Sequence, residues 1–290
     1  MVVSVVSCIN DDTIPTEPSP IISNPFVQVF QEGTIEDVTS RLETTLTEKG
    51  FNLPPFSPIQ HDIAASNVNL ELRPTRLFVF GNPNAGTLLM QEDQRIGIDL
   101  PLKMLAFTDA SDRNILGFYT ATTLARRYDI TNTQLLTRID STLIDISGLN
   151  ISTPILIREE NAPPLQEKES AQDLETTIAQ LRTAITSREF TIIGEVAHDQ
   201  AAASVDLELR PTRVLIFGKP EGGTLLMQSD QRVGIDLPLK VLVYEDENGV
   251  IKVAHYGSDF LAQRYALTDK TQVLDNINSA LAAITDDAIM

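Results

Sequence analysis

Two of the three histidines, His61 and His198, lie 137 residues apart in matching sequence surroundings. Histidine titrates near neutral pH and can act as a general base, a general acid or a metal ligand. An Asp and an Ala-rich stretch follow each one, so each is expected at the start of a short helix, where the acid suits the helix dipole. We take both as the first candidates for a ligand-binding or proton-transfer site. A structural position at the helix start is the alternative.

A Glu and an Arg, two residues apart, recur as Glu71 with Arg73 and as Glu208 with Arg210. The proline that follows each arginine favours an extended backbone, in which residues two apart share a face. A fixed carboxylate–guanidinium pair could hold an anionic ligand or tune a proton carrier. The alternative is a structural ion pair at an interface.

The segments Gly81–Thr87 and Gly218–Thr224 each follow an expected strand with the pattern Gly-x-x-x-x-Gly-Thr. That outline resembles a phosphate-binding loop, but the lysine that should precede the threonine is missing from both. Nucleotide hydrolysis is therefore not predicted. Anion binding at a helix N-terminus stays open, beside a tight turn in which Thr87 and Thr224 cap helices over 87–91 and 224–228.

Two further stretches, Asp99 to Lys103 and Asp236 to Lys240, read Asp-Leu-Pro-Leu-Lys. Their charged ends could line a cleft, or their leucines could anchor a loop. No repeated Ser or Cys nucleophile has a paired base. No metal-ligand spacing is present, so no metal site is predicted, and the cofactor is left unknown.

An internal repeat organises all of these candidates. Between residues 69–108 and 206–245, 27 of the 40 aligned pairs are identical. The register extends back to the histidines and forward through four pairs, Tyr119/Tyr256, Leu124/Leu261, Arg127/Arg264 and Tyr128/Tyr265. A unit of this length is a domain, so the chain is predicted to be two copies of one domain joined as a covalent pseudo-dimer.

Periodicity predicts the same elements in both copies. Thr34 is expected to cap a helix that ends at Gly50, and Asp173–Arg188 is its counterpart. The first copy is expected to have strands over 26–30, 54–60, 75–80, 103–108 and 115–119 and helices over 61–70, 121–128 and 131–146; the second, strands over 190–196, 212–217, 240–245 and 251–256 and helices over 198–207, 258–265 and 268–284. This mixture predicts an α+β fold, a two-layer α/β sandwich duplicated in tandem.

The domain boundaries follow from composition. Residues 1–25 are expected to be a disordered leader, 26–148 the first domain and 153–288 the second. A Pro-rich, acidic linker is expected over 149–170, in which Thr153–Arg158 could form the first strand of the second domain. Cys8, the one cysteine, follows a short apolar run. The chain is expected to be cytoplasmic, with an envelope lipoprotein or secreted protein as the alternative if Cys8 ends a truncated signal.

The net charge is −18, and neither half has a cluster of Lys and Arg. Nucleic-acid binding, which needs cationic surface, is therefore not expected. No segment approaches the roughly 20 apolar residues of a membrane-spanning helix. The expected partners are a small-molecule ligand and the other domain of the same chain, with further homo-oligomerisation left open.

Leu-Glu-Leu-Arg-Pro-Thr, Phe-Gly-x-Pro-x-x-Gly-Thr, Met-Gln and Gly-Ile-Asp-Leu-Pro-Leu-Lys occur in both copies. They resemble the domain of unknown function 302 family of prokaryotic proteins, over about 27–148 and 153–288. The resemblance implies a compact two-layer α/β fold, often assembled as a homodimer, and no reaction. Family members often carry His where Tyr128 and Tyr265 stand here.

Three functions remain open from the sequence. The favoured hypothesis is a non-enzymatic module that binds or senses a small ligand near the histidines and the Glu–Arg pairs. An enzyme that uses His61 and His198 for proton transfer is the second. A structural or partner-binding protein is the third.

Overall fold

The computed structural model describes residues 21–23, 26–149 and 164–290. The first domain has an antiparallel sheet in the order β1-β2-β6-β5-β4-β3. Its strands are β1 (Ile21–Ser23), β2 (Phe26–Gln31), β3 (Ile59–Gln60), β4 (Thr75–Phe80), β5 (Leu102–Thr108) and β6 (Asn114–Phe118). Its helices are α1 (Ile35–Glu48), α2 (His61–Asn67), α3 (Pro83–Glu92), α4 (Ala121–Ala125) and α5 (Thr133–Ser147), with a 3₁₀ helix η1 (Gln94–Asp99).

The second domain repeats this plan with an antiparallel sheet in the order β7-β11-β10-β9-β8. Its strands are β7 (Gln166–Ser170), β8 (Thr191–Ala197), β9 (Thr212–Gly218), β10 (Leu239–Glu245) and β11 (Ile251–His255). Its helices are α6 (Leu174–Ser187), α7 (His198–Ala203), α8 (Pro220–Ser229), α9 (Ser258–Tyr265) and α10 (Thr271–Ile289), with η2 (Gln231–Ile235).

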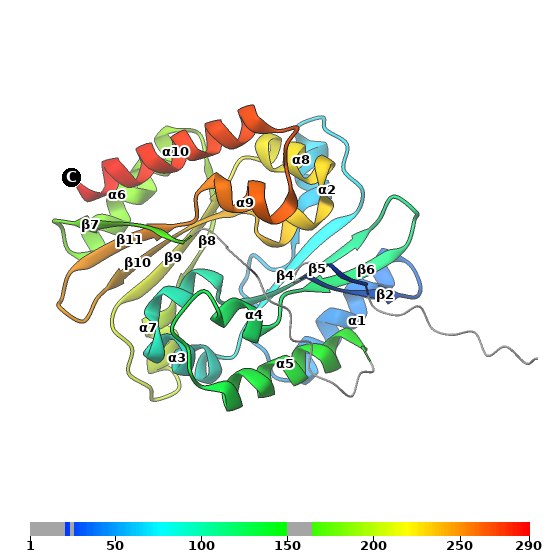
Figure 1. Ribbon diagram of the computed structural model, residues 1–290, viewed down its shortest axis with the longest axis horizontal. Coiled ribbons are helices and arrows are strands. Elements are labelled where there is room, and N and C mark those ends of the chain that lie inside the picture. Colours follow the sequence, from blue (N-terminus) through cyan, green and yellow to red (C-terminus); the bar gives the residue numbers. More distant parts are fainter. Residues whose placement is uncertain (1–20, 24–25, 150–163) are drawn as a thin grey trace, which may run out of the picture.

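Each sheet is covered on its outer side by the first and last helices of its own domain, α1 with α5 and α6 with α10 (Figure 1). These helices are amphipathic, and their apolar stripes fill the two main cores. Leu42 and Leu46 of α1 are buried in one core, and Leu181 and Ile185 of α6 in the other.

The inner side of each sheet is covered by the other domain. The 3₁₀ helix η1 of the first domain contacts β9 and β10, and η2 of the second contacts β4 and β5. Ile98 therefore belongs to an apolar cluster made otherwise of second-domain residues, and Ile235 belongs to the first domain's core. We call this surface, where η1, η2, α2, α3, α7 and α8 meet, the seam. It joins the two copies by burial of apolar side chains.

The predicted α+β class and tandem duplication are confirmed. Three details differ from the sequence expectations. Only Ile59 and Gln60 of the strand expected over 54–60 are in a ladder. Ile21–Ser23, inside the expected leader, form β1 against β2. Strand β7, inside the linker expected over 149–170, pairs with β11 as β2 pairs with β6. The strand expected at Thr153–Arg158 lies outside the described residues and stays a prediction.

Candidate functional site

Helices α3 and α8 begin four residues earlier than the sequence indicated. In α3, the N-cap is Asn82, whose side chain accepts from the backbone N–H of Ala85, and Pro83 occupies the first turn. Proline suits that position because its missing N–H would have no helical partner there. The expectation that Thr87 and Thr224 are N-caps is therefore wrong. Both threonines lie inside their helices and are buried.

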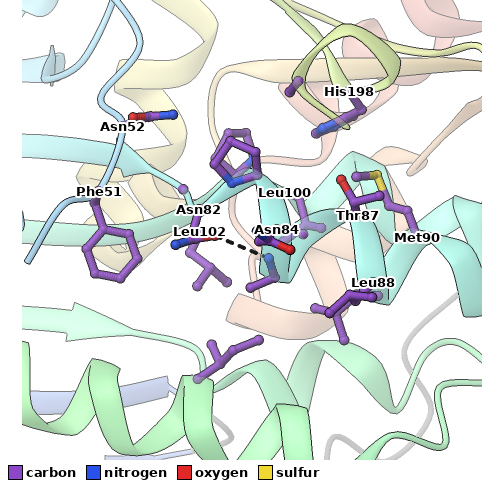
Figure 2. Close-up of a pocket in the computed structure, with 18 of the residues that line it drawn as sticks. Phe51, Asn52, Asn82, Asn84, Thr87, Leu88, Met90, Leu100, Leu102 and His198 are labelled. Atoms are coloured by element: carbon purple, nitrogen blue, oxygen red, sulfur yellow. Dashed lines mark hydrogen bonds between the residues drawn. The ribbon is translucent and has the colours of Figure 1, made fainter. Parts of the chain in front are cut away.

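Each of these helices forms one wall of a pocket that the other domain completes. The first pocket, of about 570 Å³, is lined by 81–90, by α5 and by His198 and Ala201 of α7. Figure 2 shows His198 on the side of this pocket that faces Thr87 and Met90. The second pocket, of about 960 Å³, is lined by 218–225, by α10 and by His61 and Ala64 of α2. The repeat thus builds two equivalent pockets, and each histidine belongs to the pocket of the other domain.

The histidines also fasten the seam. His61 Nε2 lies 3.0 Å from the carbonyl oxygen of Gly234, and His198 Nε2 lies 3.0 Å from that of Gly97. A carbonyl oxygen only accepts, so Nε2 carries the proton and donates. Burial lowers the pKa of each ring to about 4, against the opposing effect of this hydrogen bond. Both rings are therefore neutral at pH 7, with an unprotonated Nδ1.

Close packing explains the glycine opposite each ring. A Cβ on Gly97 would lie 3.2 Å from Met90 Sδ and 3.4 Å from His198 Cδ2, and Gly234 has the corresponding neighbours in the other half. The Gly-Ile-Asp motif thus begins with glycine because the absence of a side chain lets the histidine ring come close to the backbone at this residue. Histidine, glycine and methionine form one packing unit in each half.

Thr87 lines the first pocket with a buried hydroxyl that lacks a partner among the described residues. The side chain is 1% exposed, and its Oγ1 makes no hydrogen bond to any residue in the described parts of the chain. A buried hydroxyl without a partner costs about 1–3 kcal/mol. Thr224 is equally buried in the second pocket. The first pocket, whose lining is mainly apolar, therefore contains a hydroxyl that a ligand could satisfy.

The Glu–Arg pairs expected from the sequence are not formed among the described residues. Arg73 instead donates to Asp112 Oδ1 at 2.8 Å. Arg210 donates to Gln94 Oε1 at 2.9 Å and to the carbonyl oxygen of Glu245 at 3.0 Å. Both arginines are exposed, and neither lines the two pockets. The arginines therefore do not join the histidines in one site.

The two glutamates contribute their backbone rather than their carboxylates. Glu71 and Glu208 are exposed, and their carbonyl oxygens accept from Gln228 Nε2 at 2.8 Å and Gln91 Nε2 at 2.7 Å. Each bond crosses the seam. The extended segments before β4 and β9 therefore anchor one domain to the other through backbone carbonyl groups, and not through the interfacial Glu–Arg ion pair that was the alternative from the sequence.

A second polar cluster lies at the centre of the seam. Asp99 Oδ2 accepts from Tyr128 Oη at 2.7 Å, from Tyr256 Oη at 3.0 Å and from Arg127 at 3.1 Å. Burial raises the pKa of Asp99, but the charges of Arg127 and the nearby lysines and the Tyr128 hydrogen bond outweigh it and lower the pKa to about 2. Asp99 is therefore ionised although it is 1% exposed.

The second copy builds the matching arrangement around Asp236. Its Oδ2 accepts from Tyr265 Oη at 2.6 Å and from Arg264 at 2.8 Å. Tyr119 Oη of the first domain lies 2.8 Å from Tyr265 Oη. Since Tyr265 gives its proton to Asp236, Tyr119 is the donor of that contact. Burial and the charge of Asp236 raise the pKa of Tyr265, which keeps its hydroxyl protonated.

Lys103 of β5 and Lys240 of β10 lie near enough to Asp99 for their charges to act on it, and Lys103 is also near Asp236. Burial and the charge of Lys240 lower the pKa of Lys103 to about 7, against the opposing effect of Asp236 and Asp99. The structure thus brings together four of the predicted site residues, Asp99, Lys103, Asp236 and Lys240, in a place separate from His61 and His198.

The tyrosines and arginines of this cluster were not among the candidates from the sequence. Their signal was present, because each of these residues is identical in both copies at the constant offset. In a sequence, a tyrosine cannot be told from an ordinary core residue unless the partner of its hydroxyl is known. Here that partner is far away in the sequence. The residues missed are Tyr119, Tyr128, Tyr256, Tyr265, Arg127 and Arg264.

Among the described residues, no three His, Cys, Asp or Glu side chains are grouped as metal ligands would be. Within the same ranges, no helix has both the length and the apolar character needed to cross a bilayer.

The sequence model of the family "Domain of unknown function DUF302" matches residues 27–146 and 166–284. The chain therefore belongs to this family and contains two copies of its domain. A solved structure, that of an uncharacterized conserved DUF302 protein from Bacillus stearothermophilus, aligns over 43% of this chain and 97% of its own, with a TM-score of 0.40 and 19% identity.

Curated relatives match a shorter part of the chain. Fluoride-specific ion channel FluC 1 of Brucella suis biovar 1 (strain 1330) is 34% identical over 99 residues, which are 34% of this chain and 39% of that protein. FluC 1 of Brucella abortus biovar 1 (strain 9-941) is also 34% identical over 99 residues, or 37% of its length. The match thus spans less than two fifths of these relatives.

Proposed function

We propose that this protein binds a small organic molecule in each of its two seam pockets, without catalysing a reaction on it. The pockets are of the size that holds a small ligand, and apolar side chains form most of their walls. The observation that carries the proposal is the unpaired hydroxyl of Thr87, buried in the wall of a pocket of about 570 Å³.

The chemistry of the wall defines the ligand class. The lining includes the buried Thr87 hydroxyl and the neutral His198 ring, whose unprotonated Nδ1 can only accept. A ligand with an apolar body and one hydroxyl or amide group would satisfy these polar groups while its body fills the space along α3 and α5. Arg138 lines the same pocket and would tolerate a second, anionic substituent.

The test uses 1-naphthol, whose fluorescence can be followed because the chain has no Trp. The wild type is expected to bind two molecules. Ala85 and Gly222 occupy equivalent positions in the two pockets. Ala85→Phe and Gly222→Phe fill one pocket each, so each variant is expected to bind one molecule and the double variant none. An absence of saturable binding, or a stoichiometry that neither variant changes, would refute the proposal.

The role of the hydroxyl is tested separately. Thr87→Val keeps the shape of the side chain, so it is expected to weaken naphthol binding in the first pocket about threefold to tenfold, the equivalent of one hydrogen bond. Binding of 1-methylnaphthalene, which has no hydroxyl, should not weaken. Thr137→Val, on the exposed side of α5, is the matched control and should change neither affinity.

A further inference from the structure

The two seam pockets differ in volume, about 570 Å³ against about 960 Å³, although equivalent elements build both. Their walls can be compared residue by residue. In the last helix of each domain, Asp140 accepts from the backbone N–H of Ala121, and Asn278 accepts from that of Ser258. Ala121 and Ser258 lie 137 residues apart in the repeat, whereas the two acceptors lie 138 apart. Equivalent residues of α5 and α10 are therefore 138 positions apart.

The wall made by the last helix has smaller side chains in the second pocket. Val273, Asn276 and Ala280 of α10 stand where α5 has Leu135, Arg138 and Thr142. Helix α8 adds a further reduction, because Gly222 stands where α3 has Ala85. A Cβ on Gly222 would lie 3.9 Å from Val273 Cγ1, so the reductions in the two helices enlarge the same part of the pocket. The exchange at the arginine also replaces a cation by a neutral amide.

The second pocket also extends further along the helix that begins with its histidine. Besides the histidine and the alanine that both pockets share, α2 contributes Ile63 and Asn67 to the lining. Ile63 is 48% exposed, and the polar Gln200 stands at the equivalent position of α7. An apolar ligand that reaches this part of the wall removes the isoleucine side chain from water, which favours binding.

The cations that line the second pocket have acidic neighbours. Arg188 forms an ion pair with Asp287 at 2.7 Å, and Lys219 Nζ lies 3.6 Å from Glu189 Oε2. Glu221, the one acid in the lining, is exposed to solvent. The charges around this pocket are therefore balanced without a ligand, and the rest of the wall is mainly apolar. Such a wall suits an uncharged ligand, because an ionised group would have to leave water for it.

We propose that the second pocket binds a larger ligand than the first, an uncharged alcohol with a polycyclic body. This inference rests on the proposed function of the seam pockets and adds which ligand each pocket prefers. Thr224 and the neutral His61 ring hold the hydroxyl, as Thr87 and the other histidine do in the first pocket. The body fills the space that the smaller side chains of α8 and α10 leave open and covers the exposed isoleucine of α2.

The test uses dehydroergosterol, a fluorescent alcohol with four fused rings, beside 1-naphthol, which has two. The wild-type chain is expected to bind two naphthol molecules and one dehydroergosterol molecule. Gly222→Phe fills the second pocket and should abolish sterol binding. Ala85→Phe fills the first pocket and should leave sterol binding unchanged.

An exchange of wall residues tests which side chains set the size limit. Gly222→Ala/Val273→Leu/Ala280→Thr gives the second pocket the smaller bore of the first. It should weaken sterol binding about tenfold, the usual cost of adding a few atoms to a filled space, and should leave naphthol binding intact. Ala282→Thr, at an exposed position of α10 outside the pocket lining, is the matched control and should change neither affinity.

The reverse exchange decides the matter if the first variant does not fold. Ala85→Gly/Leu135→Val/Thr142→Ala widens the first pocket and should create a second sterol site. Sterol binding at two sites in the wild type, or an affinity and stoichiometry that neither exchange changes, would overturn the inference. So would a failure of the sterol to bind while two naphthol molecules do, and in these cases the proposed function stands. If naphthol does not bind either, the proposed function itself falls.

Discussion

Each seam histidine links a helix of one domain to a glycine carbonyl of the other. The hydrogen bond requires a proton on Nε2, and burial holds the pKa of both rings at about 4. In the unfolded chain, a histidine titrates near 6.5. Between these two values the unfolded state binds more protons than the folded state, so stability falls as the pH is lowered through that window.

His198→Gln is expected to remove the contribution of one histidine to this pH dependence of stability. A difference of about 2.5 pKa units corresponds to about 3 kcal/mol for one group, of which about 2.5 kcal/mol is lost between pH 7 and pH 4.5. Urea unfolding at the two pH values measures this. The wild type should lose about 2.5 kcal/mol more than the variant on acidification, since glutamine does not titrate.

His61→Gln repeats that experiment at the equivalent position of the first domain. Its ring has the same burial and the same partner type, so it should reduce the pH dependence by the same amount. A variant that loses as much stability as the wild type between pH 7 and pH 4.5 would show that the ring is not held neutral by the seam.

The tyrosine that donates to Asp236 should matter for stability. Tyr265→Phe removes a hydrogen bond to a buried carboxylate, which is worth about 1.5–3 kcal/mol. Tyr244→Phe is the matched control, because Tyr244 donates to Glu167, whose side chain is exposed. Chemical denaturation should show the larger loss for Tyr265→Phe. Equal losses would contradict the expectation that the hydrogen bond to the buried Asp236 carboxylate is the stronger of the two.

At the scale of elements, helix α3 shows what the sequence could and could not predict. The periodic apolar positions identified α1, α5, α6 and α10, because those helices lie on the outside of the molecule and show a clean amphipathic stripe. Helix α3 is enclosed between two domains and has no such stripe. Its start therefore had to be predicted from the turn-forming and capping residues alone. Pro83, inside the segment where a tight turn was expected, is the first residue of the helix.

The irregular segment before β3 is a second feature that the sequence could not predict. Phe56 lies against Gly194 of β8, where a Cβ would be 2.2 Å from the phenyl ring. Strand β8 has a bulge between Ile192 and Gly194. Nothing local to Phe56 indicates this contact, because it depends on how the other domain is placed. The candidate pockets were hidden for the same reason: each takes its wall from one copy and its histidine from the other.

The caps of α3 and α8 provide a test at this scale. Asn82→Ala removes the side chain that accepts from Ala85 N–H and should cost about 1 kcal/mol. Lys219, the equivalent residue in α8, makes no side-chain cap hydrogen bond, so Lys219→Ala should cost less. Thermal unfolding of both variants measures the difference. Similar losses at the two sites would argue against a capping role for Asn82.

At the scale of the whole molecule, the two domains exchange core residues. Ile98 of the first domain is buried among Val214, Ile216 and Leu242 of the second, and Ile235 is buried in the first domain's core. Neither sheet could keep its inner side dry without the other copy. We therefore expect the chain to unfold as one cooperative unit and not as two independent domains.

Ile98→Ala should lower the stability of the entire chain by about 2–4 kcal/mol, as expected for loss of a buried aliphatic side chain. Calorimetry should still show a single transition, with its midpoint lowered by roughly 2–4 °C for each kcal/mol. Cooperativity requires the ratio of calorimetric to van't Hoff enthalpy to stay near one. A single transition is expected because the cavity left by Ile98 lies between the two sheets, so both domains lose contacts at once.

Val253→Ala distinguishes this behaviour from that of two loosely attached domains. Val253 is fully buried in the second domain's own core, away from the seam. In independent domains, this substitution would lower the unfolding temperature of the second domain alone and split the transition in two. In a chain held together by the seam, it should shift one transition as a whole, as Ile98→Ala does. A split transition would show that each domain is stable without the other. The seam would then be a contact surface between two independently folded domains.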